Sequence, residues 1–243
     1  MSHDDNQASK HDTRWTAVDS YSFAYLHPSF STAPSNEVLQ HIVNNSRANH
    51  LDDIAVSPSQ GKFLMLQTRM LRAKHVLEVG TLGAYSTIWL ANAGPDVRVT
   101  TVEIDEKHAQ VSRENLEAAG VGERVEIILG SGLDVLPRLR KEVEEGRRER
   151  YGFVFIDADK QNNWAYFDES VKMCVPGACI VVDNVVRKGQ LADEEAAESD
   201  PKVKGSQAVV KSVGKDERVD GIVMQTVGEK GYDGFLIAVV NGN

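Results

Sequence analysis

Cysteine is nearly missing from this sequence: Cys174 and Cys179 are the only two among 243 residues. They flank a Pro-Gly pair and form neither a CxxC zinc or redox spacing nor a disulfide framework. The seven histidines show no metal-ligand spacing either. These absences argue against zinc-stabilised and disulfide-stabilised classes, and we expect two packed thiols in a reducing compartment.

Long apolar runs are missing as well. No stretch approaches the roughly 20 apolar residues that a membrane-spanning helix needs. The first twelve residues, MSHDDNQASKHD, are polar and carry early acids, unlike a secretory leader or an Arg-rich transit peptide. We therefore predict a cytoplasmic protein with no membrane partner, and leave uncleaved import into an organelle such as the mitochondrion open.

Basic residues are fewer than acidic residues in this sequence. The sequence has 27 Lys and Arg residues against 36 Asp and Glu residues, which gives a formal net charge of -9. This balance repels the phosphate backbone of nucleic acids. We therefore expect a small-molecule partner and no nucleic acid.

The sequence contains, from residue 57 onward, short apolar β-forming segments that alternate with helical segments. This alternation predicts an α/β protein with a mostly parallel sheet in one domain over residues 1–243. The final two strands have no helix between them and are expected to pair antiparallel. The expected strands are 75–80, 98–104, 125–129, 153–157, 179–184, 221–227 and 234–240, and the expected helices are 58–72, 85–93, 106–119, 133–146, 163–174 and 206–216.

Two segments lie outside this alternation. Residues 1–34 form an N-terminal extension with several aromatic residues near Trp15 and Tyr21, and a helix is expected over 35–49. We interpret the extension as an accessory layer that covers the active site or a dimer interface. The polar stretch 187–205 predicts a mobile surface loop, and its place after a strand makes it a candidate lid.

The turn after the first expected strand reads EVGTLGAYS, residues 78–86. Gly80 and Gly83 allow a tight turn and a close approach of a ligand to the backbone. The spacing matches neither the GxGxxG dinucleotide pattern nor a Walker phosphate loop. Two glycines alone are most simply an ordinary strand-to-helix turn.

Two further features favour a nucleoside at this edge of the sheet. Glu103 ends the second strand, 23 residues after Gly80, where an acid can accept hydrogen bonds from both hydroxyls of a ribose. The small residues GSG at 130–132 leave room for a flat base. Because no second phosphate-binding feature is present, S-adenosylmethionine fits these residues better than NAD.

Oxygen-bearing side chains follow the next two strands. The segment FVFID ends at Asp157, and CIVVDN ends at Asp183 and Asn184. Three oxygen donors without His or Cys suit a hard cation such as Mg²⁺, or another divalent cation such as Mn²⁺ or Ca²⁺. A lone Asp-x-Asp is most often a loop or a helix cap, but its pairing with a second acidic strand end favours metal binding.

Lys160 lies three residues after Asp157. Lysines are usually solvated surface residues. A nearby divalent cation disfavours the ammonium form, which suits a general base that takes the proton of a phenol bound to the same cation. Trp164 and Tyr166 follow, and are equally consistent with a core position and with a wall of the substrate site.

Together, HVLEVGTLGAYS, TTVEIDEKH, YGFVFIDADK and CIVVDNVVRKG resemble the cation-dependent class I O-methyltransferases, the caffeoyl-CoA and catechol O-methyltransferase group with bacterial and fungal relatives. The resemblance runs from about residue 37 to the C-terminus. It implies a Rossmann-like fold with a seven-stranded, mostly parallel sheet, an antiparallel last strand and helices on both faces. It also implies a homodimer that transfers a methyl group from S-adenosylmethionine to one hydroxyl of a vicinal diphenol.

The resemblance further implies the roles of single residues. It assigns metal ligation to Asp157, Asp183 and Asn184, and catalysis to Lys160 as base together with Asp157. The implied S-adenosylmethionine contacts are Val56, Glu78, Gly80, Ser86, Glu103, Ser131, Gly132, Asp157, Asp159 and Tyr166.

Two departures from the family pattern bear on the substrate. Leu82 stands where the family turn has an aromatic residue, and Ala84 where it has a second glycine. The stretch 187–205 is acidic, which disfavours the phosphates of a CoA thioester, so small catechols or flavonoids fit better. Two other interpretations stay open: a phosphatase of the D-x-D type, and a subunit that binds S-adenosylmethionine without catalysis.

Overall fold

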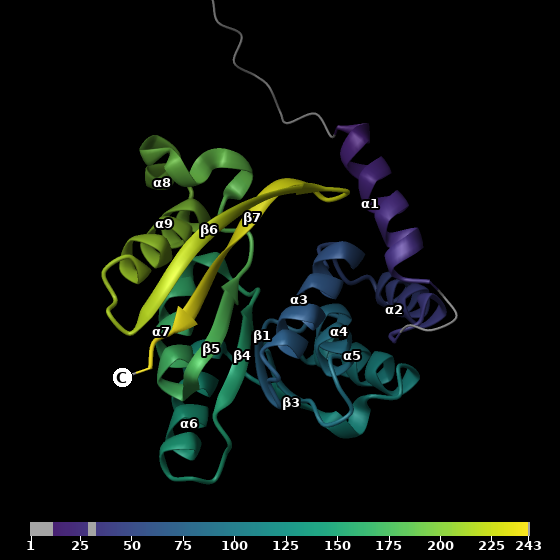
Figure 1. Ribbon diagram of the computed structural model, residues 1–243, viewed down its shortest axis with the longest axis horizontal. Helices are drawn as coiled ribbons and strands as arrows, with labels where there is room; N and C mark the ends of the chain where they lie inside the picture. The colour runs from purple at the N-terminus through teal and green to yellow at the C-terminus, as the bar shows by residue number, and fades with distance from the viewer. Residues whose placement is uncertain (1–11, 29–32, 243) are drawn as a thin grey trace, which may run out of the picture.

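A computed structural model describes residues 12–28 and 33–242 of the protein, which fold around one seven-stranded sheet (Figure 1). The strand order is β3-β2-β1-β4-β5-β7-β6. Strands β1 to β5 pair in parallel, and β7 runs antiparallel to both β5 and β6. The strands are β1 His75–Val79, β2 Arg98–Glu103, β3 Val125–Leu129, β4 Tyr151–Ile156, β5 Cys174–Val182, β6 Val219–Gly228 and β7 Gly231–Val240. This topology confirms the predicted sheet.

Helices cover both faces of the sheet (Figure 1). They are α1 Thr13–Leu26, α2 Asn36–Ala48, α3 Pro58–Met70, α4 Tyr85–Ala91, α5 Glu106–Ala118, α6 Gly132–Glu144, α7 Asn163–Met173, α8 Glu194–Ser199 and α9 Pro201–Val213. Short 3₁₀ turns lie at η1 Gly122–Arg124, η2 Lys160–Asn162 and η3 Arg187–Ala192. The expected helices from residue 35 to 174 are present, with ends that differ by a few residues.

The sheet separates two apolar cores. Alternate residues of β4 face opposite layers, as the pleat of a strand requires. Phe153 and Phe155 belong to the core shared with α2, α3 and α4, whereas Val154 and Ile156 belong to the core shared with α6, α7 and α9. All four are fully buried, which explains the uninterrupted apolar run in this strand.

The prediction of a mobile loop over 187–205 was wrong. This stretch forms η3, α8 and the first turn of α9. Asp193 and Asp200 cap the two helices, because their side chains accept hydrogen bonds from Ala196 N at 3.0 Å and Lys202 N at 2.8 Å. The polar composition therefore reflects short capped helices on the surface.

The aromatic N-terminal segment is the helix α1. Asp19 on this helix accepts hydrogen bonds from Ser59 Oγ at 3.0 Å and from the Glu229 amide at 2.8 Å. These contacts join α1 to the start of α3 and to the turn between β6 and β7. Residues 1–11 and 29–32, which belong to the predicted extension, lie outside the described residues.

The two cysteines have packing positions, as predicted. Both are buried free thiols in β5, and burial raises the pKa of each to about 12. Neither is therefore a thiolate near neutral pH. Within residues 12–28 and 33–242, no helix combines the length and apolar character that crossing a bilayer requires.

Candidate active site

A cavity of about 830 Å³ lies at the carboxyl ends of the parallel strands. The turn after β1, the end of β2 and the segments after β4 and β5 line one side of it. Residues of α2 and the segment before α3 line the other side. Ligands of open α/β sheets bind at this edge, so the cavity is the candidate site.

The turn after β1 departs from the expected role of its glycines. Gly80 has φ +98°, and a Cβ there would lie 2.8 Å from the carbonyl carbon of Asp157. The other left-handed residues are Leu82 and Ala84, with φ of 53° and 62°. Gly83 is not left-handed, and it is small because the Ser46 hydroxyl occupies the space of a side chain. Only Gly80 therefore supplies the expected backbone freedom.

Glu103 holds the glycine turn in place. Its Oε2 accepts hydrogen bonds from the amides of Thr81 at 3.1 Å and Leu82 at 2.7 Å, and its Oε1 accepts one from Asp105 N at 2.9 Å. The carboxylate is 5% exposed and lines the cavity. An acid fixed by backbone amides keeps free lone pairs for a ligand hydroxyl.

Glu78 lies behind the turn and does not line the cavity. Its carboxylate is fully buried and accepts hydrogen bonds from Ser86 Oγ at 2.6 Å, Thr101 Oγ1 at 2.7 Å and the Thr87 hydroxyl. Burial raises the pKa of Glu78 to about 7, although the three hydroxyls oppose the shift. Of this group Ser86 lines the cavity, so Glu78 fixes the hydroxyl of a residue that faces the site.

This pKa predicts a pH dependence of stability. The folded protein binds the Glu78 proton more tightly than the unfolded chain, so the contribution is full below pH 4.5 and is lost as the pH rises through about 7. Glu78→Gln should therefore reduce the fall in unfolding free energy between pH 5 and 8 by roughly 1–3 kcal/mol. Urea unfolding of the ligand-free protein measures this, and an unchanged pH slope would contradict it.

A second polar corner lies after β4. Tyr166 Oη donates a hydrogen bond to Asp159 Oδ1 at 2.5 Å, and both residues line the cavity. A Cβ at Gly132 would lie 2.7 Å from the Tyr166 ring, so the glycine makes room for the tyrosine. Ser131 accepts a hydrogen bond from the Leu133 amide at 3.2 Å and does not line the cavity, whereas its neighbours Gly130 and Gly132 do.

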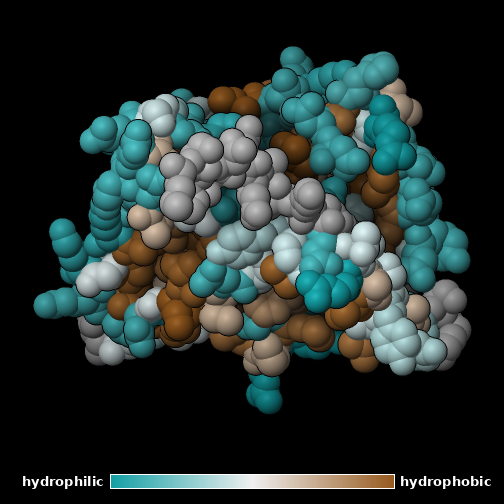
Figure 2. Space-filling view, turned by 90° about the horizontal axis from the view of Figure 1, so that it is seen from above, coloured by the Kyte–Doolittle hydropathy of each residue, from teal (hydrophilic) through white to brown (hydrophobic). Residues whose placement is uncertain are grey.

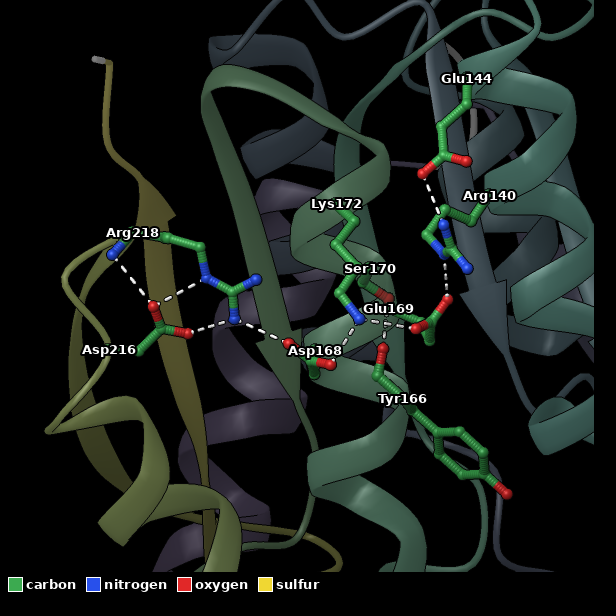
Figure 3. Close-up of polar contacts among 9 residues, drawn as sticks. All are labelled: Arg140, Glu144, Tyr166, Asp168, Glu169, Ser170, Lys172, Asp216 and Arg218. Carbon is green, nitrogen blue, oxygen red and sulfur yellow. Dashed lines mark hydrogen bonds and ion pairs between the residues drawn. The ribbon is translucent and has the colours of Figure 1, made fainter.

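Ion pairs on the outer face of α7 hold the helix that carries Tyr166 (Figure 3). Arg140 Nε of α6 donates to Glu169 at 2.9 Å, and Arg218 Nη2 donates to Asp168 at 2.7 Å. Figure 3 shows the Tyr166 ring turned away from this network. Each exposed pair is worth little alone, but together they anchor α7 on both sides. The other members are Glu144, Lys172 and Asp216.

The two predicted metal acids lie at equivalent ends of neighbouring strands. Ile156 of β4 pairs with Val182 of β5, so Asp157 and Asp183 follow side by side. Asp183 is 4% exposed, and burial together with the charge of Asp157 raises its pKa well above the ordinary range. Gln60 Nε2 donates to Asp183 Oδ1 at 2.7 Å. Asn184 follows with a left-handed φ of 53° and lines the cavity.

Lys160 is buried beside these acids. Its Nζ donates to Asp157 Oδ1 at 2.6 Å, and the side chain is 10% exposed. Helix α9 passes directly over this segment at Gly205. A Cβ at Gly205 would lie 2.6 Å from Gln161 Cα and 2.7 Å from the carbonyl carbon of Lys160. Gly205 therefore sets how closely α9 holds the backbone of Lys160.

Gly205→Ala should displace this segment. Alanine favours a helix over glycine by about 1 kcal/mol, but the added methyl meets backbone, and overpacking of this kind costs about 1–3 kcal/mol. We expect a net loss of stability and a loss of enzymatic rate on the order of 10²-fold, because a shift of about 1 Å in a catalytic group has that effect. Thermal unfolding and kcat measure the two. A matched control is Gly122→Ala, where the nearest atom lies at 3.8 Å, and equal behaviour of both variants would exclude the crowding argument.

Most predicted site residues line one cavity. These are Val56, Gly80, Ser86, Glu103, Gly132, Asp157, Asp159, Lys160, Tyr166 and Asn184. Glu78, Ser131 and Asp183 do not line it. The sequence did not indicate Gln60, Gly205 or the basic lining residues Arg187 and Lys202, because isolated polar or small residues give no periodic signal.

Comparison with known proteins places this site in a family. The O-methyltransferase family model matches residues 29–238. The chain is 48% identical over 240 residues to the O-methyltransferase imqG of Aspergillus flavus, which covers 99% of this chain and 95% of that protein. It is 45% identical over 196 residues to a catechol O-methyltransferase of Mycobacterium tuberculosis, covering 80% and 84%. The solved O-methyltransferase of Bacillus cereus in complex with SAH has a TM-score of 0.85 and 43% identity, covering 94% of this chain and 99% of that one. The chain therefore belongs to the O-methyltransferase family of enzymes.

Proposed function

We propose that this O-methyltransferase uses S-adenosylmethionine and a divalent cation to methylate one hydroxyl of a vicinal diphenol, such as a catechol or a flavonoid. The observation that carries the proposal is the pair Asp157 and Asp183, which stand side by side at neighbouring strand ends beside a cavity lined by Glu103. Family membership removes the phosphatase interpretation.

The cavity supports binding of the cofactor. The amides of Thr81 and Leu82 fix Glu103 at the end of β2, where a ribose would reach it. Gly130 and Gly132 line the cavity close to Glu103, since the Gly130 amide donates a hydrogen bond to the Glu103 carbonyl oxygen at 2.7 Å. Asp159 and Tyr166 lie toward the acids and suit the methionine end. S-adenosylmethionine supplies the methyl group when it is bound there.

The acids also fit a divalent cation. Within the described residues no cluster of three or more His, Cys, Asp or Glu side chains suits a metal, so the proposed set of two carboxylates depends on Asn184 as third ligand. All three donors are oxygens, and the pKa of Asp183 is raised by burial and by the charge of Asp157, both of which a bound cation would offset. A bound cation would hold both oxygens of the diphenol and favour loss of a proton from one of them.

Lys160 is the proposed acceptor of that proton. Its Nζ lies 2.6 Å from Asp157 Oδ1, so a cation held by Asp157 would lie close to the amine and would disfavour a second positive charge there. In its neutral form Lys160 would accept the proton that the reacting phenol oxygen loses, and the bound cofactor would supply the methyl group to that oxygen as its own carbon–sulfur bond breaks. The side chain is nearly enclosed, so bulk water competes little for the proton.

The proposal is tested by methyl transfer from S-adenosylmethionine to a catechol with magnesium and with excess EDTA. We expect turnover only with magnesium, and slow turnover of a phenol that has one hydroxyl and is unable to chelate. Binding of S-adenosylmethionine is measured separately, because a subunit without catalytic activity would bind the cofactor and methylate no acceptor. Full activity in excess chelator would remove the cation from the mechanism.

We also propose a homodimer. Apolar side chains gather in patches on the upper face of the molecule (Figure 2). Helix α1 exposes Val18, Tyr21 and Tyr25 by 67–70%, and their spacing of three and four residues places them on one face of the helix. Contiguous exposed apolar side chains mark association surfaces. Analytical ultracentrifugation is expected to give twice the chain mass, and a monomer at micromolar concentration would contradict this.

A further inference from the structure

Two basic side chains line the cavity near the proposed metal acids. Arg187 lies three residues after Asn184, and Lys202 is in the first turn of α9. Neither forms an ion pair with any residue in 12–28 or 33–242, in contrast to Lys160 and Arg218. In a chain with a net charge of -9, unpaired cations at a ligand cavity need an explanation.

The position of Arg187 is fixed by its backbone. Its amide donates to Asp233 Oδ1 at 3.0 Å, and the same oxygen accepts a hydrogen bond from Gly234 N at 2.9 Å. The residue has a left-handed φ of 53°, which turns the chain sharply after β5. Asp233 therefore holds the loop, and its charge lies near the guanidinium without forming a hydrogen bond to it.

The Arg187 guanidinium is incompletely satisfied. Its Nε is buried and has no hydrogen-bond partner. A buried donor left unpaired costs about 1–3 kcal/mol, so native structures usually satisfy such groups when the ligand is bound. The part-buried guanidinium of Arg124, by comparison, donates to the carbonyl oxygens of Gly94 at 3.1 Å and Val97 at 3.2 Å.

The geometry points to an acceptor with an anionic group. We propose, on the basis of the diphenol methylation proposed above, that the acceptor carries a carboxylate on the side of its ring opposite the two hydroxyls. Arg187 follows Asn184 by three residues, so the backbone positions of the two are at most about 11 Å apart. A single aromatic ring with its carboxylate can therefore reach from the proposed ligand Asn184 to the Arg187 side chain. Arg187 forms charge-assisted hydrogen bonds to this carboxylate, and the exposed Lys202 adds long-range attraction.

The test compares three acceptors that share the diphenol: 3,4-dihydroxybenzoate, 3,4-dihydroxybenzyl alcohol and 3,4-dihydroxybenzylamine. The wild-type enzyme should have the highest kcat/KM for the carboxylate and the lowest for the amine. Arg187→Gln should reduce the ratio of kcat/KM for the carboxylate to that for the alcohol by about 10–100-fold. Because the readout is a ratio, a general loss of activity does not affect it.

A matched control is Lys188→Gln. Lys188 is the exposed neighbour of Arg187, does not line the cavity, and loses the same charge on substitution. Its acceptor ratio should stay at the wild-type value. Lys202→Gln should lower the ratio by a few-fold and more at low salt, because its contribution is screened.

The outcomes separate the two proposals. If no diphenol is methylated with cofactor and magnesium, the proposed function fails. The carboxylate proposal alone fails if the alcohol or the amine is methylated as efficiently as the carboxylate. It also fails if Arg187→Gln leaves the acceptor ratio unchanged, which would mean that the guanidinium only stacks on the ring. A CoA thioester of 3,4-dihydroxybenzoate is a further comparison. If the enzyme prefers this thioester to the free acid, and Arg187→Gln lowers its kcat/KM as strongly, the partner of Arg187 is a phosphate and the carboxylate proposal is overturned.

Discussion

Replacing Asp183 with asparagine is expected to lower the rate of methyl transfer by about 10³-fold, because a cation that is no longer held correctly gives up several kcal/mol of charge stabilisation in the transition state. The side chain stays the same size and keeps a carbonyl oxygen that can accept the 2.7 Å hydrogen bond from Gln60. Cofactor affinity should change little, since Asp183 does not line the cavity. Steady-state kinetics and calorimetric titration measure the two separately.

The stability of this variant should change in the opposite direction to its rate. Wild-type Asp183 is a buried acid whose pKa is raised by burial and by Asp157, so its ionisation without a cation destabilises the fold. In chelator near pH 8 the asparagine variant should therefore unfold at a higher temperature than the wild type. Added magnesium should stabilise the wild type by mass action and leave the variant unchanged. An equal magnesium effect in both proteins would place the cation elsewhere.

The pair of acids could be predicted from the sequence, because its physical basis is local. A fully apolar strand such as 153–156 has to be buried on both faces, and its first carboxylate marks the edge where the strand leaves the core. Parallel strands end at the same edge, so Asp157 and Asp183 had to be near each other. The glycine turn and Glu103 followed from the same reasoning.

The surroundings of this pair depend on tertiary packing and could not be predicted. Gln60 reaches Asp183 from 123 residues away, and no local pattern connects them. Gly205 was part of a presumed loop, because the capping roles of Asp193 and Asp200 look like ordinary surface acidity in a sequence. The hydroxyls of Thr87 and Thr101 that hold Glu78 were not predicted either, because they come from α4 and β2 and meet this carboxylate only in the folded layer that the alternation of β1 turns it toward.

Lys160 is expected to be the second residue on which the rate depends. Lys160→Met keeps the volume of the side chain and removes the amine, and loss of a general base lowers kcat by about 10²–10⁴-fold. Lys160→Arg keeps a positive charge that can pair with Asp157, but the guanidinium does not give up a proton near neutral pH. If Lys160 is the base, both variants should be slow. Recovery of the rate in the arginine variant would show that only the charge beside Asp157 matters.

The acidity of the acceptor provides an independent readout for the same residue. A nitro group on a catechol makes its hydroxyls more acidic, so proton removal requires less help from a base. The defect of Lys160→Met should therefore be smaller for nitrocatechol than for catechol, whereas Asp183→Asn should impair both acceptors because both need the cation. An equal defect of Lys160→Met with the two acceptors would mean that Lys160 positions Asp157 through its 2.6 Å ion pair without accepting the proton. The lysine amine would then be a positioning group for Asp157, and solvent would take the proton.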